Sequence, residues 1–328
     1  MDELQDLRGQ HLTLHVGVGI SERRLDKYLH GRFRNLSRHF LQTAIRAGGV
    51  TVNGKPAKPS QQLRHGDVVE MTLPEPPSKT IEPEDIPLDV IYEDSDIIIL
   101  NKPADLIVHP ARGNKSGTLV NALVHYSDQL SSGLGEFRPG IVHRLDRDTT
   151  GVMIVTKHET AQWKIAKQFE NRQTQKTYLA IVHGTPELDA DRINAPLAVH
   201  PQVREKYAVR PEIGKEAITY YEVLEAFRGF SLLKCEPKTG RTHQIRVHLS
   251  HIKHPIVADD MYGGKLVYPW QLADAEQAVE EPIINRCALH AFSIEFRHPG
   301  TDQMVKFEAP LPPDMQRLLD MLRQYRTA

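Results

Sequence analysis

A proline-rich stretch, PEPPSKTIEPED at positions 74–85, divides the sequence into two unequal parts. Four prolines and mixed charge within twelve residues are typical of a semi-rigid, extended connection and not of a packed helix or strand. A chain of 328 residues is long enough for two domains and a substantial core. We therefore predict an N-terminal domain at 1–75, a linker at 76–85 and a larger domain at 86–328.

The N-terminal domain is predicted to contain two helices followed by strands. Ser21 and Ser37 are suited to cap the helices, and Gly48–Gly49 is expected to end the second. Asn53–Gly54 favours the tight turn of a β-hairpin, and a further strand is expected at 67–73. The apolar positions expected to face inward are Leu25, Tyr28 and Leu29 in the first helix and Phe40, Leu41, Ala44 and Ile45 in the second.

Basic residues are concentrated in this same domain. The whole chain has a formal net charge of −1, but residues 21–58 hold nine Lys or Arg against two acids, a local charge of +7. A solvated helical surface normally carries mixed charge, so the shortage of acids favours selective contact with the phosphates of RNA or DNA. The residues predicted to contact RNA are Arg24, Lys27, Arg38, Arg46 and Lys55.

Strand-like segments dominate the larger domain, and helices interrupt them irregularly. This order predicts an α+β fold with a mixed, largely antiparallel sheet. Helices are expected at 160–171, from Thr242 and after Pro312–Pro313, whereas 264–286 is expected to be a surface loop with a short helix at 272–279. The predicted strands lie in LDVIYE (88–93), DIIILN (96–101), GVMIVTK (151–157), TYLAIVHG (177–184) and FSLLKCEP (230–237).

One aspartate, Asp146, lies among arginines in the stretch HRLDRDTTG, at an expected loop on the edge of the core. Burial raises the pKa of a carboxyl group and an opposing arginine lowers it, so an arginine partner is what keeps a nucleophilic aspartate ionised. Taken alone, such a residue more often caps a turn or makes an ion pair. Asp148 is the nearest second acid.

Two further stretches carry candidate site residues. In KTGRTHQIRVHLSHIKH, residues 238–254, Arg246 and Leu249 are three positions apart on a predicted helix, so a cation and an aliphatic group can reach one cavity. In KTYLAIVHG, Tyr178 is either a core tyrosine or a ring that stacks on a base and whose hydroxyl handles a proton.

The composition argues against several other classes of protein. The histidines at 243, 248, 251 and 254 fall on different helix faces without a nearby cysteine, so we expect surface or RNA-facing histidines and no metal site. Cys235 and Cys287 form no disulfide framework. An acidic start and the lack of a long apolar run predict no signal peptide and no membrane span, and hence a reduced cytoplasmic location.

The motifs together resemble a known family. RLDKYL, SRHFLQTAIRAGGVTVNGK and LRHGDVV resemble the S4-like RNA-binding domain over about residues 15–75. HRLDRDTTGVMIV, KTYLAIVHG and GRTHQIRVHL, in this order, resemble the RluA family of pseudouridine synthases, in the branch that carries an S4-like domain and modifies large-subunit ribosomal RNA. The resemblance extends over nearly the whole chain, and 264–286 departs from it.

This resemblance implies roles for individual residues. Asp146 would be the catalytic nucleophile, Tyr178 would pack on the target base and help to remove the C5 proton, and Arg246 would pair with the aspartate. Arg144 would help to displace the flipped base, and Leu249 would be a wall of the uracil pocket.

The expected activity is the isomerisation of uridine to pseudouridine in RNA. It consumes nothing, so no cofactor or metal is expected, and a monomer without DNA or membrane partners is the default. The same chemistry on tRNA, or a ribosome-assembly factor with dispensable catalysis, remains an alternative. A glycosidase-type hydrolase would need two carboxylates at a defined separation, with Asp148 as the only near candidate.

Overall fold

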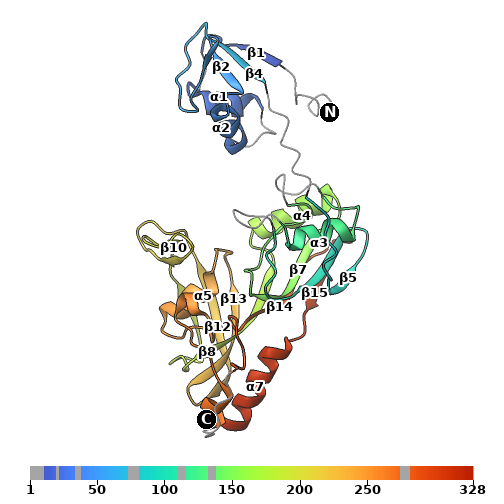
Figure 1. Ribbon diagram of the computed structural model, residues 1–328, viewed down its shortest axis with the longest axis vertical. Coiled ribbons are helices and arrows are strands. Elements are labelled where there is room, and N and C mark those ends of the chain that lie inside the picture. The colour runs from blue at the N-terminus through green and yellow to red at the C-terminus, as the bar shows by residue number, and fades with distance from the viewer. Residues whose placement is uncertain are drawn as a thin grey trace. The chain divides into compact units, whose positions relative to one another are not determined.

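The computed structural model describes residues 11–19, 22–33, 38–72, 81–109, 116–131, 138–273 and 281–327, without the side chains of His39, Phe40 and Thr43 (Figure 1). The chain separates into two compact units, Met1–Thr80 and Ile81–Ala328. The predicted helix caps Ser21 and Ser37 and the side chain of Phe40 lie outside the described residues. No described helix combines the length and the apolar character that a bilayer crossing requires.

The first unit packs two helices on a four-stranded antiparallel sheet with strand order β1-β4-β2-β3. Asn53 and Gly54 both have positive φ, 53° and 72°, as the predicted two-residue hairpin turn requires. The strand β1 was not predicted, because the alternation of Leu12 and Leu14 with polar residues in HLTLH is too short to stand out. The elements are β1 (His11–His15), α1 (Leu25–Arg32), α2 (Arg38–Arg46), β2 (Val50–Val52), β3 (Lys55–Pro56) and β4 (Val68–Thr72).

The second unit begins earlier than the linker prediction allowed. Ile81 packs against its core. Asn121, on helix α3 (Leu119–Tyr126), donates a hydrogen bond to the carbonyl of Glu82 at 2.8 Å, and its own carbonyl accepts one from the amide of Glu84 at 3.1 Å. Residues 81–85 of the predicted 76–85 linker are therefore tied to the second unit.

A nine-stranded sheet organises the second unit, in the order β5-β6-β7-β14-β8-β13-β12-β9 with β15 paired to β14. Among the described strands only β7 and β14 pair in parallel, so the predicted mixed, largely antiparallel α+β fold is confirmed. Its strands are β5 (Val90–Glu93), β6 (Ile97–Lys102), β7 (Thr150–Thr156), β8 (Gln175–His183), β9 (Ala190–Asn194), β12 (Ile218–Phe227), β13 (Phe230–Pro237), β14 (Leu289–Arg297) and β15 (Met304–Glu308), while β10 (Leu197–Val199) and β11 (Tyr207–Val209) form a separate hairpin.

Strands β6 and β7 read as continuous apolar runs because both of their faces are covered. Ile98 and Met153 pack with α3 on one side of the sheet. Ile99 and Ile154 pack on the other side with Ile165 of α4 (Glu159–Glu170). A strand buried on both faces has no polar side, so the alternation of a half-exposed strand is absent.

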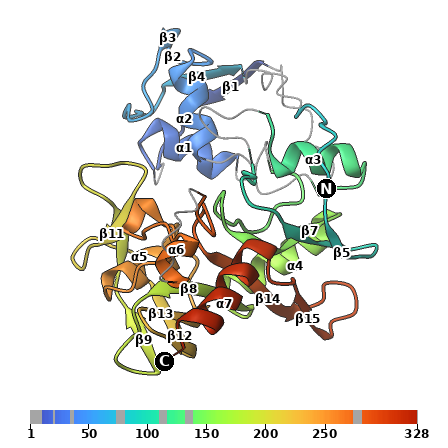
Figure 2. The same ribbon diagram turned by 60° about the horizontal axis from the view of Figure 1, so that its bottom comes forward.

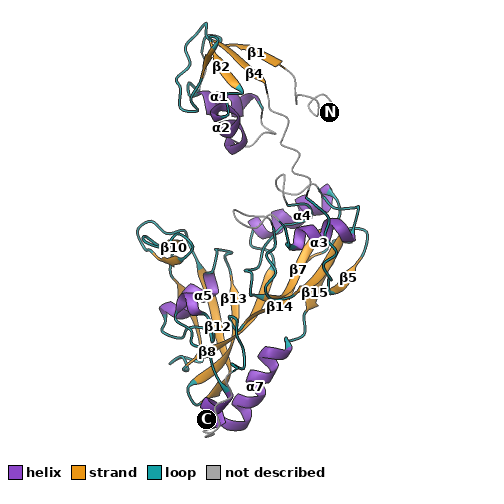
Figure 3. Ribbon diagram, in the orientation of Figure 1, coloured by secondary structure: helices purple, strands orange, loops and turns teal. Residues whose placement is uncertain are grey.

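Two more helices cover the other half of the sheet (Figure 3). Helix α7 (Pro313–Tyr325) follows the two prolines as predicted and packs four buried residues, Met315, Leu318, Leu319 and Leu322, into the core beside β8 and β13. Helix α5 (Gln244–His251) contributes Ile245 and Leu249 to the same core.

The prediction for 264–286 was wrong in part. Its short helix, α6, spans Pro269–Ala273 and so begins before the predicted 272–279; residues 274–280 lie outside the described residues. Val267 bridges to Ile284, and both side chains are buried in the core with Leu272. The described ends of this segment are therefore part of the packed structure.

Candidate active site

A cavity of about 560 Å³ lies in the second unit, lined by the loop before β7, by β8 and by the start of α5. Pockets of this volume commonly hold small ligands. Helix α5 packs against β11, β12 and β13 (Figure 2). This packing brings Asp146, Tyr178 and Arg246, from three distant stretches of sequence, to the wall of one cavity.

The loop that carries Asp146 is held by buried groups on several sides. The His143 ring accepts a hydrogen bond from the amide of Ile154 at 3.0 Å and stacks on Phe169. Lys102 donates to the carbonyl of Arg147 at 2.8 Å, and Arg286 donates to the carbonyl of Asp148 at 3.1 Å. These contacts fix the loop on the sheet, so the Asp146 backbone has a defined position.

Gly151, at the end of the motif, is required by a close approach of two strands. Its φ is 114°, and a β-carbon at this position would lie 2.2 Å from the carbonyl oxygen of Ala291 on β14. Any side chain would therefore separate β7 from β14 where their parallel pairing supports the loop.

Asp146 is only loosely held at the cavity wall. Its side chain is 21% exposed; Arg246 Nη1 lies 3.4 Å from Oδ2, and His243 Nε2 lies 3.8 Å from Oδ1. Both distances exceed the 2.7–3.2 Å of a normal N–H···O hydrogen bond. The carboxylate therefore lies near a cationic side chain but still has lone pairs that accept no hydrogen bond of normal length.

Arg246 is oriented by a second acid that the sequence did not reveal. Asp259, which is fully buried, accepts from Nε and Nη2 of Arg246 at 2.7 Å each. Burial lowers the pKa of Arg246, but the hydrogen bonds to Asp259 raise it further, so the guanidinium remains charged. This bidentate pair leaves Nη1 free to face Asp146.

Tyr178 bridges two parts of the core and lines the cavity. Burial, and then the nearby charge of Asp146, raise the pKa of its hydroxyl well above the usual range. The phenol is therefore neutral at physiological pH. In this state it offers an apolar ring face and one hydroxyl proton to anything bound beside Asp146.

Of the two predicted substrate contacts, one lines the cavity and the other does not. Arg144 is exposed and lies on the wall. Leu249 is fully buried in the core instead, and Ile245 and Leu289 supply apolar wall. Helix α5 presents Arg246 to the cavity at its first turn, whereas Leu249, three residues later, is buried in the core of the second unit.

The basic residues predicted to contact RNA fall into two groups in the first unit. Arg24 and Arg38 both hydrogen-bond the carboxylate of Asp26, and Lys27 pairs with Glu22 at 3.2 Å. Arg46 and Lys55 are exposed. The count of charges in the sequence did not show that one buried aspartate, Asp26, binds two of these arginines and so neutralises part of the basic surface.

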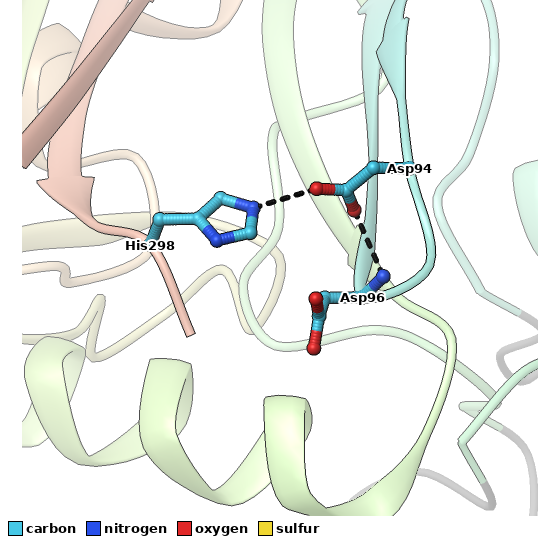
Figure 4. A group of neighbouring side chains, drawn as sticks. All are labelled: Asp94, Asp96 and His298. Carbon is cyan, nitrogen blue, oxygen red and sulfur yellow. Dashed lines mark hydrogen bonds and ion pairs between the residues drawn. The ribbon is translucent and has the colours of Figure 1, made fainter. Parts of the chain in front are cut away.

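Among the described residues, one group has the spacing of a metal site: Asp94, Asp96 and His298 (Figure 4). His298 Nδ1 accepts from the amides of Gly300 and Thr301, so its proton is on Nε2, which faces Asp94 at 2.9 Å. A protonated nitrogen cannot ligate a cation. The group links the segments that follow β5 and β14 through the close contact of His298 with Asp94 and does not fit a metal.

The histidines of α5 form no metal site in the described part of the chain. The expectation that they face the surface or RNA was wrong for His248, which is fully buried and hydrogen-bonds Thr219 and the carbonyl of Ala195. His251 is exposed, and His243 lines the cavity. The helix therefore uses its histidines in three different ways.

Two lysines near the site, Lys102 and Lys176, were not predicted from the sequence. Lys102 is fully buried and donates to three carbonyls, and burial lowers its pKa to about 7. Lys176 lines the cavity, and burial followed by the charge of Lys238 lowers its pKa to about 8. The one signal for Lys102 was a lysine closing an otherwise apolar strand.

Comparison with known proteins places these features in a family. The model of the RNA pseudouridylate synthase family matches residues 96–251, and that of the S4 domain matches residues 23–69. The "Ribosomal large subunit pseudouridine synthase D" of Xanthomonas campestris is 41% identical over 92% of this chain and 89% of its own. Its Escherichia coli namesake is 39% identical over 95% of this chain and 94% of its own.

A solved structure agrees with the fold. "Human RNA Pseudouridylate Synthase Domain Containing 4" superposes with a TM-score of 0.55 at 26% identity, covering 72% of this chain and 93% of that one. From the fold, the cavity and these relatives, the chain belongs to the RNA pseudouridine synthase family, whose members isomerise uridine in RNA, and it carries an S4 domain at its N-terminus.

Proposed function

We propose that this enzyme converts specific uridines of large-subunit ribosomal RNA into pseudouridine in the cytoplasm, with Asp146 as nucleophile. The observation that carries the role of Asp146 is a carboxylate on the cavity wall, beside the guanidinium of Arg246 but without a short hydrogen bond to it. The two relatives named for large-subunit ribosomal RNA support the target, since they align along nearly their whole length.

The cavity accounts for the steps that the chemistry needs. A uridine within folded RNA must be flipped out at a cost of a few kcal/mol. The exposed guanidinium of Arg144 can take the vacated place, and the ring of Tyr178 can pack on the uracil. The C1′–N1 bond then breaks, a C1′–C5 bond forms, C5 loses its proton and N1 gains one, so nothing is consumed.

Each of the three central residues has a defined task in this proposal. Asp146 supplies the nucleophile, Arg246 places a positive charge beside it, and the neutral hydroxyl of Tyr178 takes part in moving the C5 proton. The first unit holds the RNA through the exposed Arg46 and Lys55, with Arg24, Lys27 and Arg38 contributing less because their charges are already paired.

The test is the Asp146→Asn substitution in the full-length protein. We expect pseudouridine formation in ribosomal RNA to fall by at least about a thousandfold, while the Kd for that RNA changes less than twofold. Asp148→Asn is the matched control, because Asp148 does not line the cavity, and it should retain activity. Full turnover by Asp146→Asn would refute the assignment.

The same assay separates the alternatives. A hydrolase would release free uracil, with the exposed Glu170 as the second carboxylate on the wall, whereas an isomerase retains the base. Mapping pseudouridines in cells with and without the protein distinguishes ribosomal RNA from tRNA. Rescue of ribosome assembly by Asp146→Asn would favour the assembly factor.

A further inference from the structure

We propose that His243 is a positioning residue that presents a neutral Nε2–H to the Oδ1 atom of Asp146, with its tautomer set by Tyr262. This inference rests on the proposed role of Asp146 in the reaction. It gives the carboxylate a second partner, from a residue that neither its sequence motif nor its place beside other histidines had suggested.

The His243 ring is held rigidly at the start of α5. Its backbone is left-handed, with φ 55° and ψ 21°, a conformation that few residues other than glycine adopt unless the surroundings impose it. The ring lies edge-on between Tyr207 and Tyr262, with centroid distances of 6.0 and 5.6 Å. Its side chain is 15% exposed, so the ring has little freedom to turn.

A chain of hydrogen bonds selects the tautomer. The backbone amide of Tyr207 donates to the hydroxyl oxygen of Tyr262 at 2.9 Å, and that hydroxyl lies 2.8 Å from Nδ1 of His243. If Tyr262 donates its proton to Nδ1, every group in the chain is satisfied, whereas the opposite direction leaves the phenolic hydrogen unused. The proton of the neutral ring is then on Nε2.

The other end of the ring leads to the same assignment. Nε2 faces Asp146 Oδ1 at 3.8 Å, where a lone pair would repel the carboxylate and an N–H attracts it. Burial lowers the pKa of His243 more than the charge of Asp146 raises it, so the ring stays neutral at physiological pH. Both ends of the imidazole therefore favour Nε2–H.

A neutral donor orients Asp146 without weakening it as a nucleophile. Arg246 already supplies one full positive charge at Oδ2, at 3.4 Å. A second cation would stabilise the carboxylate further and lower its reactivity, but an N–H at Oδ1 only fixes the plane of the group. A shift of less than 1 Å brings either donor to hydrogen-bond distance, so the two can close on Asp146 when the substrate is bound.

The first experiment compares two substitutions with the same backbone demand. His243→Gln keeps an N–H donor near the position of Nε2, and His243→Leu keeps the bulk without a donor; both impose the same left-handed strain. We expect kcat to fall about tenfold to a hundredfold in His243→Leu and less than fivefold in His243→Gln, with KM and RNA Kd unchanged. His251→Leu, at an exposed site on the same helix, is the control and should be unaffected.

The second experiment reads the tautomer directly. In the full-length protein labelled with ¹⁵N-histidine, the His243 signals should report a protonated Nε2 and an accepting Nδ1. Tyr262→Phe keeps the ring under Arg246 but removes the hydroxyl, so the signals should move toward a mixture of tautomers and kcat should fall less than in His243→Leu.

The outcomes separate this inference from the proposed function. Wild-type kcat in His243→Leu alongside an inactive Asp146→Asn would overturn the inference and leave the proposed function intact. Equal losses in His243→Gln and His243→Leu, or an imidazole with its proton on Nδ1, would also overturn it. An active Asp146→Asn would refute the proposed function itself.

Discussion

The tripeptide Arg-Leu-Asp occurs once in each unit, and the aspartates of the two copies have different surroundings. In the first unit Arg24 turns back on Asp26 with bonds of 3.1 and 3.2 Å, and the aspartate is fully buried. In the second unit the arginine, Arg144, is exposed on the cavity wall, and Asp146 is partly exposed beside Arg246 from 100 residues away. The leucine is buried in both copies.

Saturation of the carboxylate distinguishes the two sites. Asp26 also accepts from Arg38 and from Gln42, the latter at 2.7 Å. Burial raises the pKa of Asp26, but these hydrogen bonds lower it by more, and the net pKa lies well below its usual range. An acid that accepts five hydrogen bonds of 2.7–3.2 Å stabilises a fold. Asp146, with contacts of 3.4 and 3.8 Å, retains lone pairs for chemistry.

The largest test is to make the second site resemble the first. Asp259→Asn removes the charge that holds Arg246, which can then bond Asp146 directly, as Arg38 bonds Asp26. We expect kcat to fall about a hundredfold and the free energy of unfolding to fall by about 2 kcal/mol, because Arg246 loses two charge-assisted hydrogen bonds of 2.7 Å to a buried carboxylate. Activity assays and urea denaturation measure the two effects, and unchanged kcat would mean that Asp259 does not position Arg246.

Removing the buried acid of the first unit should lower the stability of that unit and leave the cavity of the second unit unchanged. Asp26→Asn weakens the hydrogen bonds that this buried group accepts from Arg24 and Arg38, whose side chains remain partly solvated, and we expect that unit to lose about 2 kcal/mol. Trp163 and Trp270 both lie in the second unit. The tryptophan fluorescence transition in urea should therefore be unchanged while part of the circular dichroism transition shifts; a shift in both signals would contradict the separation of the units.

The two units should also differ in their response to acid. In the second unit, burial lowers the pKa of His290 to about 4 and that of His143 to about 3, from 6.5. The unfolded chain then binds more protons, so stability falls as pH drops from 6.5 toward these values, by about 3 kcal/mol for His290. Asp26 affects the stability of the first unit at lower pH. Its pKa is lowered from 3.8, so its contribution to the free energy of unfolding is fully present above about pH 3.8 and is lost as pH falls further.

Denaturation at several pH values checks this order. On acidification, the free energy of unfolding measured by fluorescence, which reports the second unit, should fall first. The dichroism signal of the folded first unit should persist to below about pH 4. Replacing His290 with Gln should reduce the slope of the fluorescence-detected stability between pH 6.5 and 4. An unchanged slope would assign the acid sensitivity to other groups.

The smallest expected effects concern RNA binding by the first unit. Arg46→Ala or Lys55→Ala should weaken RNA binding severalfold and reduce the slope of log K against log salt by about one unit. Lys27→Ala should do less, because its charge is paired with Glu22. Kd measurements at several salt concentrations test this, and equal effects of all three would show that the ion pair does not matter.

Local patterns in the sequence predicted much of the fold. The apolar runs at 96–101 and 151–157 became β6 and β7, the Asn-Gly pair became a hairpin turn, and the two prolines preceded α7. Strand β1 was missed because its residues are polar in alternation and its stability comes from pairing with β4, 61 residues away at His11 and Thr72.

The residues of the candidate site were predicted from the sequence only in part. Asp146, Tyr178 and Arg246 were predicted from motifs and do line one cavity, whereas Leu249 does not. Asp259, Tyr262 and Lys102 carried no motif, and their tasks depend on atoms that meet only in the folded chain. No spacing rule reports such partners, because they lie on different elements.

The sequence by itself determined many of the strands and helices and that an aspartate would lie among arginines, since these depend on neighbouring residues. It could not distinguish Arg24-Leu25-Asp26 from Arg144-Leu145-Asp146 by the tripeptide alone. Only the tertiary structure decided that one carboxylate is buried and saturated while the other faces a cavity. The physical reason is that solvation and hydrogen-bond partners, which set the reactivity of an acid, come from residues distant in the chain.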